Sequence, residues 1–109
     1  MSRPFRDFFT ARFPLFRALP DSLIIIARLE AFVNTYKNNL MVDFRTEYPI
    51  LKEEDYLLFL YIVVDFSARA ISILIGESLP VVYNRKSSLK RKIQQGESNM
   101  KERFLLEFA

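Results

Sequence analysis

The clearest periodic pattern of the chain lies between positions 21 and 40. Apolar residues recur there at alternating spacings of three and four, which places them on one face of a helix. This stripe consists of Ile26, Leu29, Val33, Tyr36 and Leu40. The preceding Pro20 and Asp21 are typical of a turn that leads into a helix start. The pattern therefore predicts a helix over 21–40. Positions 41–50 lack a helical period and are predicted to be a connection or a short strand.

An uninterrupted run of eight apolar residues occupies positions 57–64. Such a run is compatible with a buried strand, but the acids Glu53, Glu54 and Asp55 precede it and suit the positive end of a helix dipole. We therefore predict a helix. Because this helix is apolar nearly all round, it must be covered on more than one side. The helix predicted over 21–40 and a Phe-rich segment before it are the expected covers.

Two capped helices are predicted to follow this run. Ser67 is a helix-start residue for a helix over 68–75, and Gly76 supplies a left-handed end. Ser78 starts a longer helix with Pro80 in its first turn, where a missing N–H costs little. This helix is expected to run to about position 95. The residues expected to face inward are Ala70, Ile71, Leu74, Ile75, Val82, Leu89 and Ile93.

The two ends of the chain also have helical patterns. After Gly96, which is again expected to be left-handed, Asn99 and Glu102 have the spacing of a capping box. They introduce a segment whose apolar face is either core or a dimer contact: Met100, Phe104, Leu105 and Phe108. Near the start, phenylalanines interleave with arginines over positions 3–17, with a break expected at Pro14. This segment is interpreted as a core-facing amphipathic helix, with a transit peptide or membrane-surface helix as the alternatives.

Together these patterns predict an all-α fold and a single helical domain over 1–109. Its parts are an N-terminal helical segment (1–48), a central helical core (51–95) and a C-terminal helix (97–109). With only two glycines in 109 residues, few hairpin turns are expected.

The composition narrows the possible functions. The chain has no Cys and no His, so disulfides, thiolate metal sites and the commonest general base are excluded. We expect no enzyme activity, cofactor, metal or small-molecule ligand. The longest apolar run is far below the roughly 20 residues that span a bilayer. No secretory signal pattern is evident. The expected location is therefore cytoplasmic, without membrane insertion by this chain.

The charge distribution adds a candidate binding surface. Between Tyr83 and Gln95 the chain carries five basic residues and no acid. Such a block is either a polyanion-binding face or a solvated helix surface. Two helices joined by a Gly-x-Ser turn, the second one basic, have the outline of a helix-turn-helix. The second helix would present Tyr83, Asn84 and Ser87 to base edges in the major groove, and Arg85, Lys86, Lys90, Arg91 and Lys92 to phosphates.

At these residues the sequence resembles the LuxR-type helix-turn-helix domain. Positions 51–93 follow that pattern without a gap: Leu51, Ser67, Leu74, Ile75, Gly76, Ser78, Val82, Arg91, Lys92 and Ile93 match it. The closer likeness is to C-terminal DNA-binding domains of Bacteroidetes transcriptional regulators, whose recognition helix contains Tyr-Asn followed by basic residues, like Tyr83 and Asn84 here. One departure is Asp65, which stands where the family usually has Gly.

The resemblance implies a transcriptional regulator domain that binds double-stranded DNA. The recognition helix would be about 79–95. Because one such module makes few base contacts, a homodimer on two half-sites is expected. The alternative is a helical module for protein interaction or dimerisation, in which the basic face is incidental.

Overall fold

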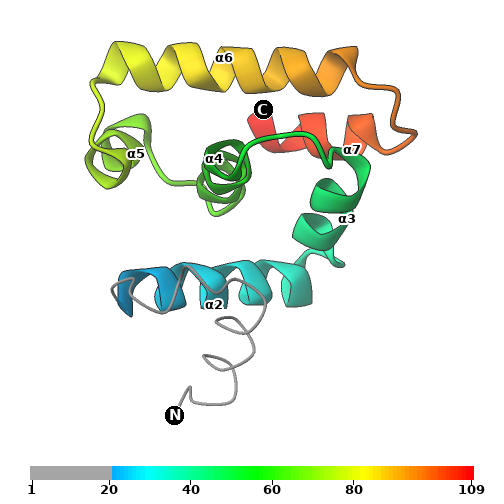
Figure 1. The fold of residues 1–109 in the computed structure, drawn as a ribbon, viewed down its shortest axis with the longest axis horizontal. Helices are drawn as coiled ribbons and strands as arrows, with labels where there is room; N and C mark the ends of the chain where they lie inside the picture. The colour runs from blue at the N-terminus through cyan, green and yellow to red at the C-terminus, as the bar shows by residue number, and fades with distance from the viewer. Residues whose placement is uncertain (1–20) are drawn as a thin grey trace.

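The computed structural model describes residues 21–109, and every regular element in this range is helical (Figure 1). The predicted all-α class is therefore confirmed for this part of the chain. The elements are α2 (Asp21–Tyr36), α3 (Leu40–Glu47), α4 (Glu53–Val63), α5 (Ala68–Ile75), α6 (Leu79–Gln95), α7 (Lys101–Leu105) and the 3-10 turn η2 (Leu106–Phe108). The expected helix of the Phe-rich segment, with its break at Pro14, lies outside the described residues.

Helix α4 is the centre around which the other helices are arranged. It is seen end-on in the middle of Figure 1, with α6 on one side and α2 on the opposite side. Helices α3 and α6 and the turn η2 contact it directly. Seven of its 11 residues are buried: Tyr56, Leu58, Phe59, Leu60, Tyr61, Ile62 and Val63. The prediction that this helix is covered on several sides is confirmed, and α3 and the C-terminal segment are covers that the pattern did not indicate.

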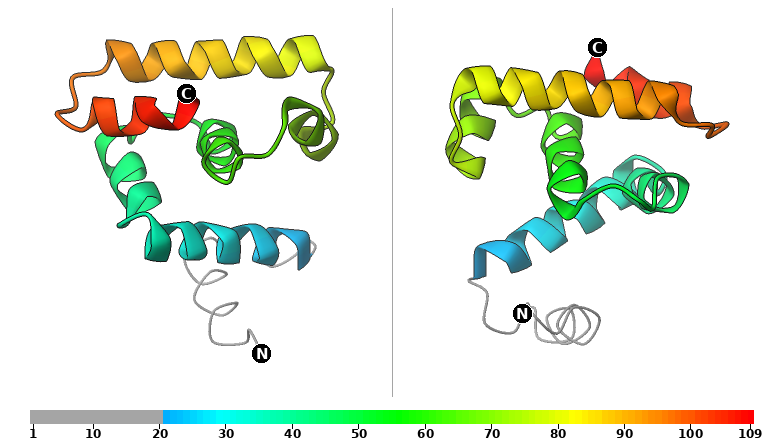
Figure 2. Two further views of the ribbon diagram at one scale, coloured as in Figure 1. Left: turned by 180° about the vertical axis from the view of Figure 1, so that it is seen from behind. Right: turned by 45° about the horizontal axis from the view of Figure 1, so that its top comes forward.

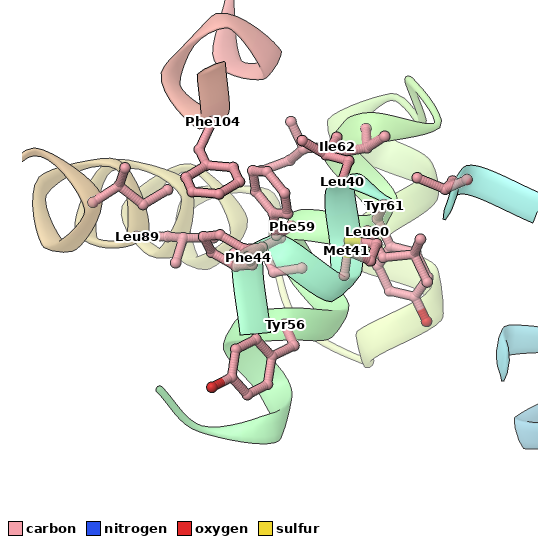
Figure 3. Packing of buried hydrophobic residues seen from close by; sticks show 14 of the residues in the cluster. Leu40, Met41, Phe44, Tyr56, Phe59, Leu60, Tyr61, Ile62, Leu89 and Phe104 are labelled. Carbon is pink, nitrogen blue, oxygen red and sulfur yellow. The ribbon is translucent and has the colours of Figure 1, made fainter. Parts of the chain in front are cut away.

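A cluster of aromatic rings joins α4 to its neighbours. Phe44 of α3 stacks on Phe59 of α4 with ring centroids 3.9 Å apart. Phe104 of α7 meets Phe44 edge-on at 5.1 Å. Figure 3 shows these rings together, with Leu89 of α6 beside them. All four side chains are fully buried. The apolar face of the C-terminal segment therefore packs within the chain, so it no longer argues for a dimer contact.

The predicted start of that C-terminal helix is wrong. Helix α7 begins at Lys101, and no side chain caps it through a hydrogen bond at the N-cap position. Instead the Ser98 hydroxyl accepts a hydrogen bond from the backbone N–H of Met100, at 2.9 Å. The capping-box spacing of Asn99 and Glu102 is therefore not used, because the turn that precedes the helix is closed by Ser98.

The predicted helix over 21–40 is divided into two. Helix α2 ends at Tyr36, and Asn38 and Asn39 both adopt left-handed backbone angles, with φ of 59° and 61°. Helix α3 then occupies the region predicted to be a connection. Asparagine adopts this conformation more readily than other non-glycine residues, so the pair can end one helix and begin another. As a result Tyr36, expected in the buried stripe, is 73% exposed.

The start of α3 is capped by a side chain from α2. The Asn34 carbonyl oxygen, Oδ1, accepts hydrogen bonds from the backbone N–H groups of Met41 (2.9 Å) and Val42 (3.1 Å). These are first-turn donors that have no partner within their own helix. The N-cap residue Asn39 makes no side-chain capping bond. Asn34 therefore fixes both the position where α3 begins and its angle to α2.

Gly76 is left-handed as predicted, whereas Gly96 is not. Gly96 has a φ of −70°, an angle that any residue adopts. A glycine is needed at this position for steric reasons, because a Cβ atom would collide with the ring of Tyr48. The Tyr48 hydroxyl donates to the carbonyl of Ile93 at 3.0 Å, and the Tyr56 hydroxyl donates to the carbonyl of Tyr48 at 2.5 Å. These bonds tie the end of α6 to α3 and α4.

Arg45 joins three helices through ion pairs. Its guanidinium donates to both carboxylate oxygens of Glu30 in α2, at 2.7 and 2.9 Å, and to Glu53 in α4 at 3.0 Å. It also lies 4.5 Å from the centre of the Tyr56 ring. Burial alone would lower the pKa of Arg45, but the hydrogen bonds that it donates to Glu30 and Glu53, with the attraction of their charges, outweigh burial and raise that pKa. The guanidinium therefore stays charged and holds α2, α3 and α4 together.

Replacing Asn34 tests the cap between α2 and α3. Asn34→Ala should lower the free energy of unfolding by about 1 kcal/mol, because two first-turn N–H groups of α3 lose their acceptor. Asn34→Asp keeps an acceptor oxygen at the positive end of α3 and should retain most of the stability. Urea denaturation followed by circular dichroism measures both. Equal losses for the two variants would contradict the capping role.

Candidate nucleic-acid interface

Helices α5 and α6 are connected by a tight turn, as the sequence predicted. The Ser67 hydroxyl accepts from the backbone N–H of Ala70 at 3.1 Å and so caps α5. Gly76 ends α5 with a φ of 69°. Ser78 occupies the N-cap position of α6, but its side chain makes no capping hydrogen bond. The two helices contact each other directly. This turn fixes where α6 starts.

The inward face of α5 is narrower than predicted. Ile71 is completely buried and Ile75 is partly buried, but Leu74 is 53% exposed. Only one side of α5 meets α6, because the two helices are joined by a short turn and pack at their near ends. The prediction that Leu74 faces inward is therefore wrong.

Helix α6 is attached by the apolar stripe that the sequence indicated. Val82, Leu89 and Ile93 are fully buried. They lie against three elements, since α6 contacts α5, α4 and α7 along its length (Figure 2). A helix of 17 residues is about 25 Å long. The stripe holds α6 against the core over most of that length, and its other side faces outward.

Six of the eight predicted contact residues are exposed, and all of these except Lys92 form the outward side of α6. Tyr83, Asn84, Ser87, Lys90 and Arg91 are all exposed. Their spacing places them on the side of the helix away from the buried stripe. Tyr83 is 57% exposed, so most of its ring does not pack on α5. We call these five residues the basic face. It combines an amide, two hydroxyls and two cations, and contains no acidic side chain.

The other three predicted residues are placed differently. Arg85 lies toward α4 and pairs with Glu54 at 3.6 Å and with Glu77 at 3.3 Å. Lys92 pairs with Asp55 at 3.2 Å. Lys86 is half-buried and lies beside the buried stripe of α6, four residues after Val82. The basic block is therefore divided: Lys90 and Arg91 are on the exposed face, whereas Arg85 and Lys92 are engaged by carboxylates within the chain.

The carboxylates that engage these cations were not identified as part of a site from the sequence. Glu54 and Asp55 were assigned to the helix dipole of α4, and Asp55 does accept from the N-cap backbone N–H of Lys52 at 3.3 Å. Together with the cations they border a shallow, open hollow between the start of α4 and α6, lined by Glu54, Asp55, Leu58, Arg85, Ser88 and Lys92. One sequence signal for this pairing is the absence of acids within the basic block. Because its cations have no carboxylate close by in the sequence, their partners come from other segments of the chain.

The departure at Asp65 coincides with a left-handed backbone. Asp65 has a φ of 64° just after α4. The backbone N–H of Asp65 donates to Ile62, and that of Phe66 donates to Tyr61, each at 3.0 Å. The rings of Phe66 and Tyr61 stack at 5.8 Å. These are the two bonds and the apolar contact of a Schellman motif, whose left-handed position is usually Gly. The aspartate therefore keeps the helix end that glycine would make.

In comparisons with family models, with curated proteins and with solved structures, no match to this chain was found. Within residues 21–109, no group of carboxylates is arranged to hold a metal ion. None of the helices in that range combines the length and apolar character that crossing a membrane requires.

Substitution of Asp65 tests the helix end. Asp65→Gly should raise the free energy of unfolding by about 0.5–1 kcal/mol, because glycine adopts a positive φ without a Cβ penalty. Asp65→Ala should lower it, since alanine has that penalty and no polar side chain to offset it. Thermal melts of the two variants give the sign. A less stable glycine variant would contradict the assignment.

Proposed function

We propose that this chain is a DNA-binding domain of a transcriptional regulator and that α6 is its recognition helix. The observation that supports this most is the division of α6 into two sides. One side is a fully buried stripe, and the other is an exposed basic face without acids. The resemblance of positions 51–93 to the LuxR-type helix-turn-helix supports the same function. Such a regulator would act in the cytoplasm, where bacterial DNA lies.

The proposed contacts follow from the chemistry of the exposed side chains. The major groove of B-DNA is about 12 Å wide and admits an α-helix. The Asn84 amide can pair with both the N6 and N7 atoms of adenine, and the hydroxyls of Tyr83 and Ser87 can donate or accept at base edges or phosphates. Lys90 and Arg91, one to two turns further along, would contact phosphates. Affinity would therefore come mainly from phosphate contacts and depend on salt.

The proposed partner is duplex DNA bound by two copies of the chain. One helix reads few base pairs, so sequence-specific binding would use two half-sites. The half-site spacing would then mirror the distance between the two recognition helices.

Binding to a duplex of random sequence tests this function. Fluorescence anisotropy across a salt series should give a plot of log K against log salt with a slope of about −2 for each bound chain, because Lys90 and Arg91 would each neutralise one phosphate. Lys90→Glu combined with Arg91→Glu should weaken binding by at least about tenfold and flatten the slope by about two units, because two phosphate contacts become repulsive. The matched control is Arg28→Glu with Lys37→Glu, two exposed cations in and just after α2, which changes the net charge by the same amount and should change affinity by less than about twofold.

Two results would contradict the DNA-binding function. One is that the wild-type chain does not bind the duplex at low salt, whether the chain is a monomer or a dimer. The other is an equal loss for the control and for the double variant, because a general charge effect would then replace the basic face.

A second candidate function is self-association through α2. Ile25, Phe32 and Tyr36 are exposed on this helix, and the rings of Phe32 and Tyr36 lie 4.4 Å apart. Their spacing of seven and four residues places them on one stripe. A second copy of the chain would supply the same stripe in a two-fold arrangement. Because α2 lies opposite α6, this contact would direct the two basic faces away from each other (Figure 1). Self-association through α2 therefore fits a protein-interaction module. It does not fit a dimer that places two recognition helices on adjacent half-sites of one duplex.

Sedimentation velocity distinguishes this candidate. Phe32→Ser with Tyr36→Ser should shift a dimer to a monomer if α2 forms the interface, while Lys90→Glu with Arg91→Glu should leave the dimer intact. A wild-type chain that is monomeric at about 100 μM would exclude self-association of functional strength through this stripe.

A further inference from the structure

We propose that Glu54 and Glu77 hold Arg85 away from DNA phosphates and so limit the affinity of α6 for DNA. This inference rests on the proposed function and concerns its regulation. Arg85 lies in the basic block that the sequence assigned to DNA. In the folded chain its two terminal nitrogens point to different carboxylates, Nη1 to Glu54 at 3.6 Å and Nη2 to Glu77 at 3.3 Å.

The geometry makes carboxylate and phosphate competitors for the same group. A guanidinium presents its donors in a planar fork that suits carboxylate and phosphate oxygens equally. Nη2 donates a hydrogen bond to Glu77, and Nη1 lies within ion-pair distance of Glu54. A phosphate that approaches Arg85 therefore competes for a guanidinium whose charge is already shared with two carboxylates. The two carboxylates also exceed the single positive charge of Arg85, so this cluster carries a net negative charge.

The same arrangement continues along the α4 side of α6. Lys92 pairs with Asp55 at 3.2 Å, and both residues line the shallow hollow that also contains Glu54 and Arg85. Two cations and three carboxylates therefore border this side of the helix. Lys90 and Arg91 lie on the exposed face beyond it. The phosphate footprint of α6 is thus confined to the basic face, and the α4 side repels the DNA backbone.

The pairs are weak enough to be displaced. Glu54 and Glu77 are substantially exposed, and exposed ion pairs contribute little stability and are screened by salt. Neither carboxylate is buried in the core, so both can be neutralised without disturbing the fold. Asp55 is less suitable for substitution, because it also accepts a hydrogen bond from the backbone of Lys52.

A double-mutant cycle on the full chain tests the proposal. The four proteins are wild type, Arg85→Ala, Glu54→Gln with Glu77→Gln, and the triple variant, each titrated into a random-sequence duplex across a salt series. Arg85→Ala should change the wild-type affinity by less than about twofold. Neutralising both carboxylates should raise affinity about threefold to tenfold and steepen the salt slope by about one unit. Adding Arg85→Ala should abolish most of the gain.

The control separates competition from general charge. Glu97→Gln with Glu102→Gln adds the same net charge near the connection between α6 and α7, away from Arg85. It should raise affinity by less than about twofold. Single Glu54→Gln and Glu77→Gln variants should each give part of the gain, which provides a second test if the double variant folds poorly.

The possible results are distinct. If Arg85→Ala weakens the wild type as much as it weakens the neutralised variant, Arg85 already contacts DNA and the proposal is wrong. A control that matches the gain of Glu54→Gln with Glu77→Gln overturns it as well, since charge alone would explain the effect. If none of the proteins binds the duplex, the proposed function fails, and this inference fails with it.

Discussion

The arrangement of the described residues depends on covering α4. A surface helix usually buries a stripe about 100° wide, but α4 buries seven of its 11 residues and needs apolar neighbours on several sides. Each buried side chain of this size contributes about 1.5–3 kcal/mol, so leaving one side open would cost more than typical domains can lose. Helix α6 is one of these covers. Its apolar stripe is therefore fixed against the core, and its basic face must point outward. The orientation of the candidate interface follows from the burial of α4.

Much of the helical layout after position 50 was predictable because its signals are local. Ser67 accepts from its own first turn, Gly76 is left-handed, and the three buried residues of α6 are those that its spacing indicated. The break between α2 and α3 was not predictable in this way. The apolar spacing of three and four residues continues to Leu40, although the helix ends at Tyr36. The bonds that start α3 come from Asn34, seven and eight residues before their donors.

The same difference between local and distant contacts applies to the candidate interface. Which side chains α6 exposes was evident from its spacing, because exposure depends on the period of one helix. The pairing of Lys92 with Asp55 was not evident, since the two residues are 37 positions apart and meet only when α6 covers α4. A charge count therefore overestimates the cations that are free on this helix. The left-handed Asp65 is a related case, because an aspartate gives no clear local signal of the helix end that the backbone bonds of Asp65 and Phe66 form.

Ile71 is the one fully buried residue of α5, with Ala68 and Ile75 partly buried against the core, and this small buried area influences which parts of the fold open first. The C-terminal half of α6 is anchored by the Tyr48 hydrogen bond and by packing near Phe104, whereas its N-terminal half packs on α5 and reaches α4 through the exposed pair of Arg85 with Glu54. Local unfolding events with low free energy will therefore release α5 first. Amide hydrogens of α5 should therefore exchange with solvent faster than those of α4, which buries more of its residues. The end of α6 that carries Tyr83 and Asn84 is therefore expected to open at a lower free energy than the end that carries Lys90 and Arg91.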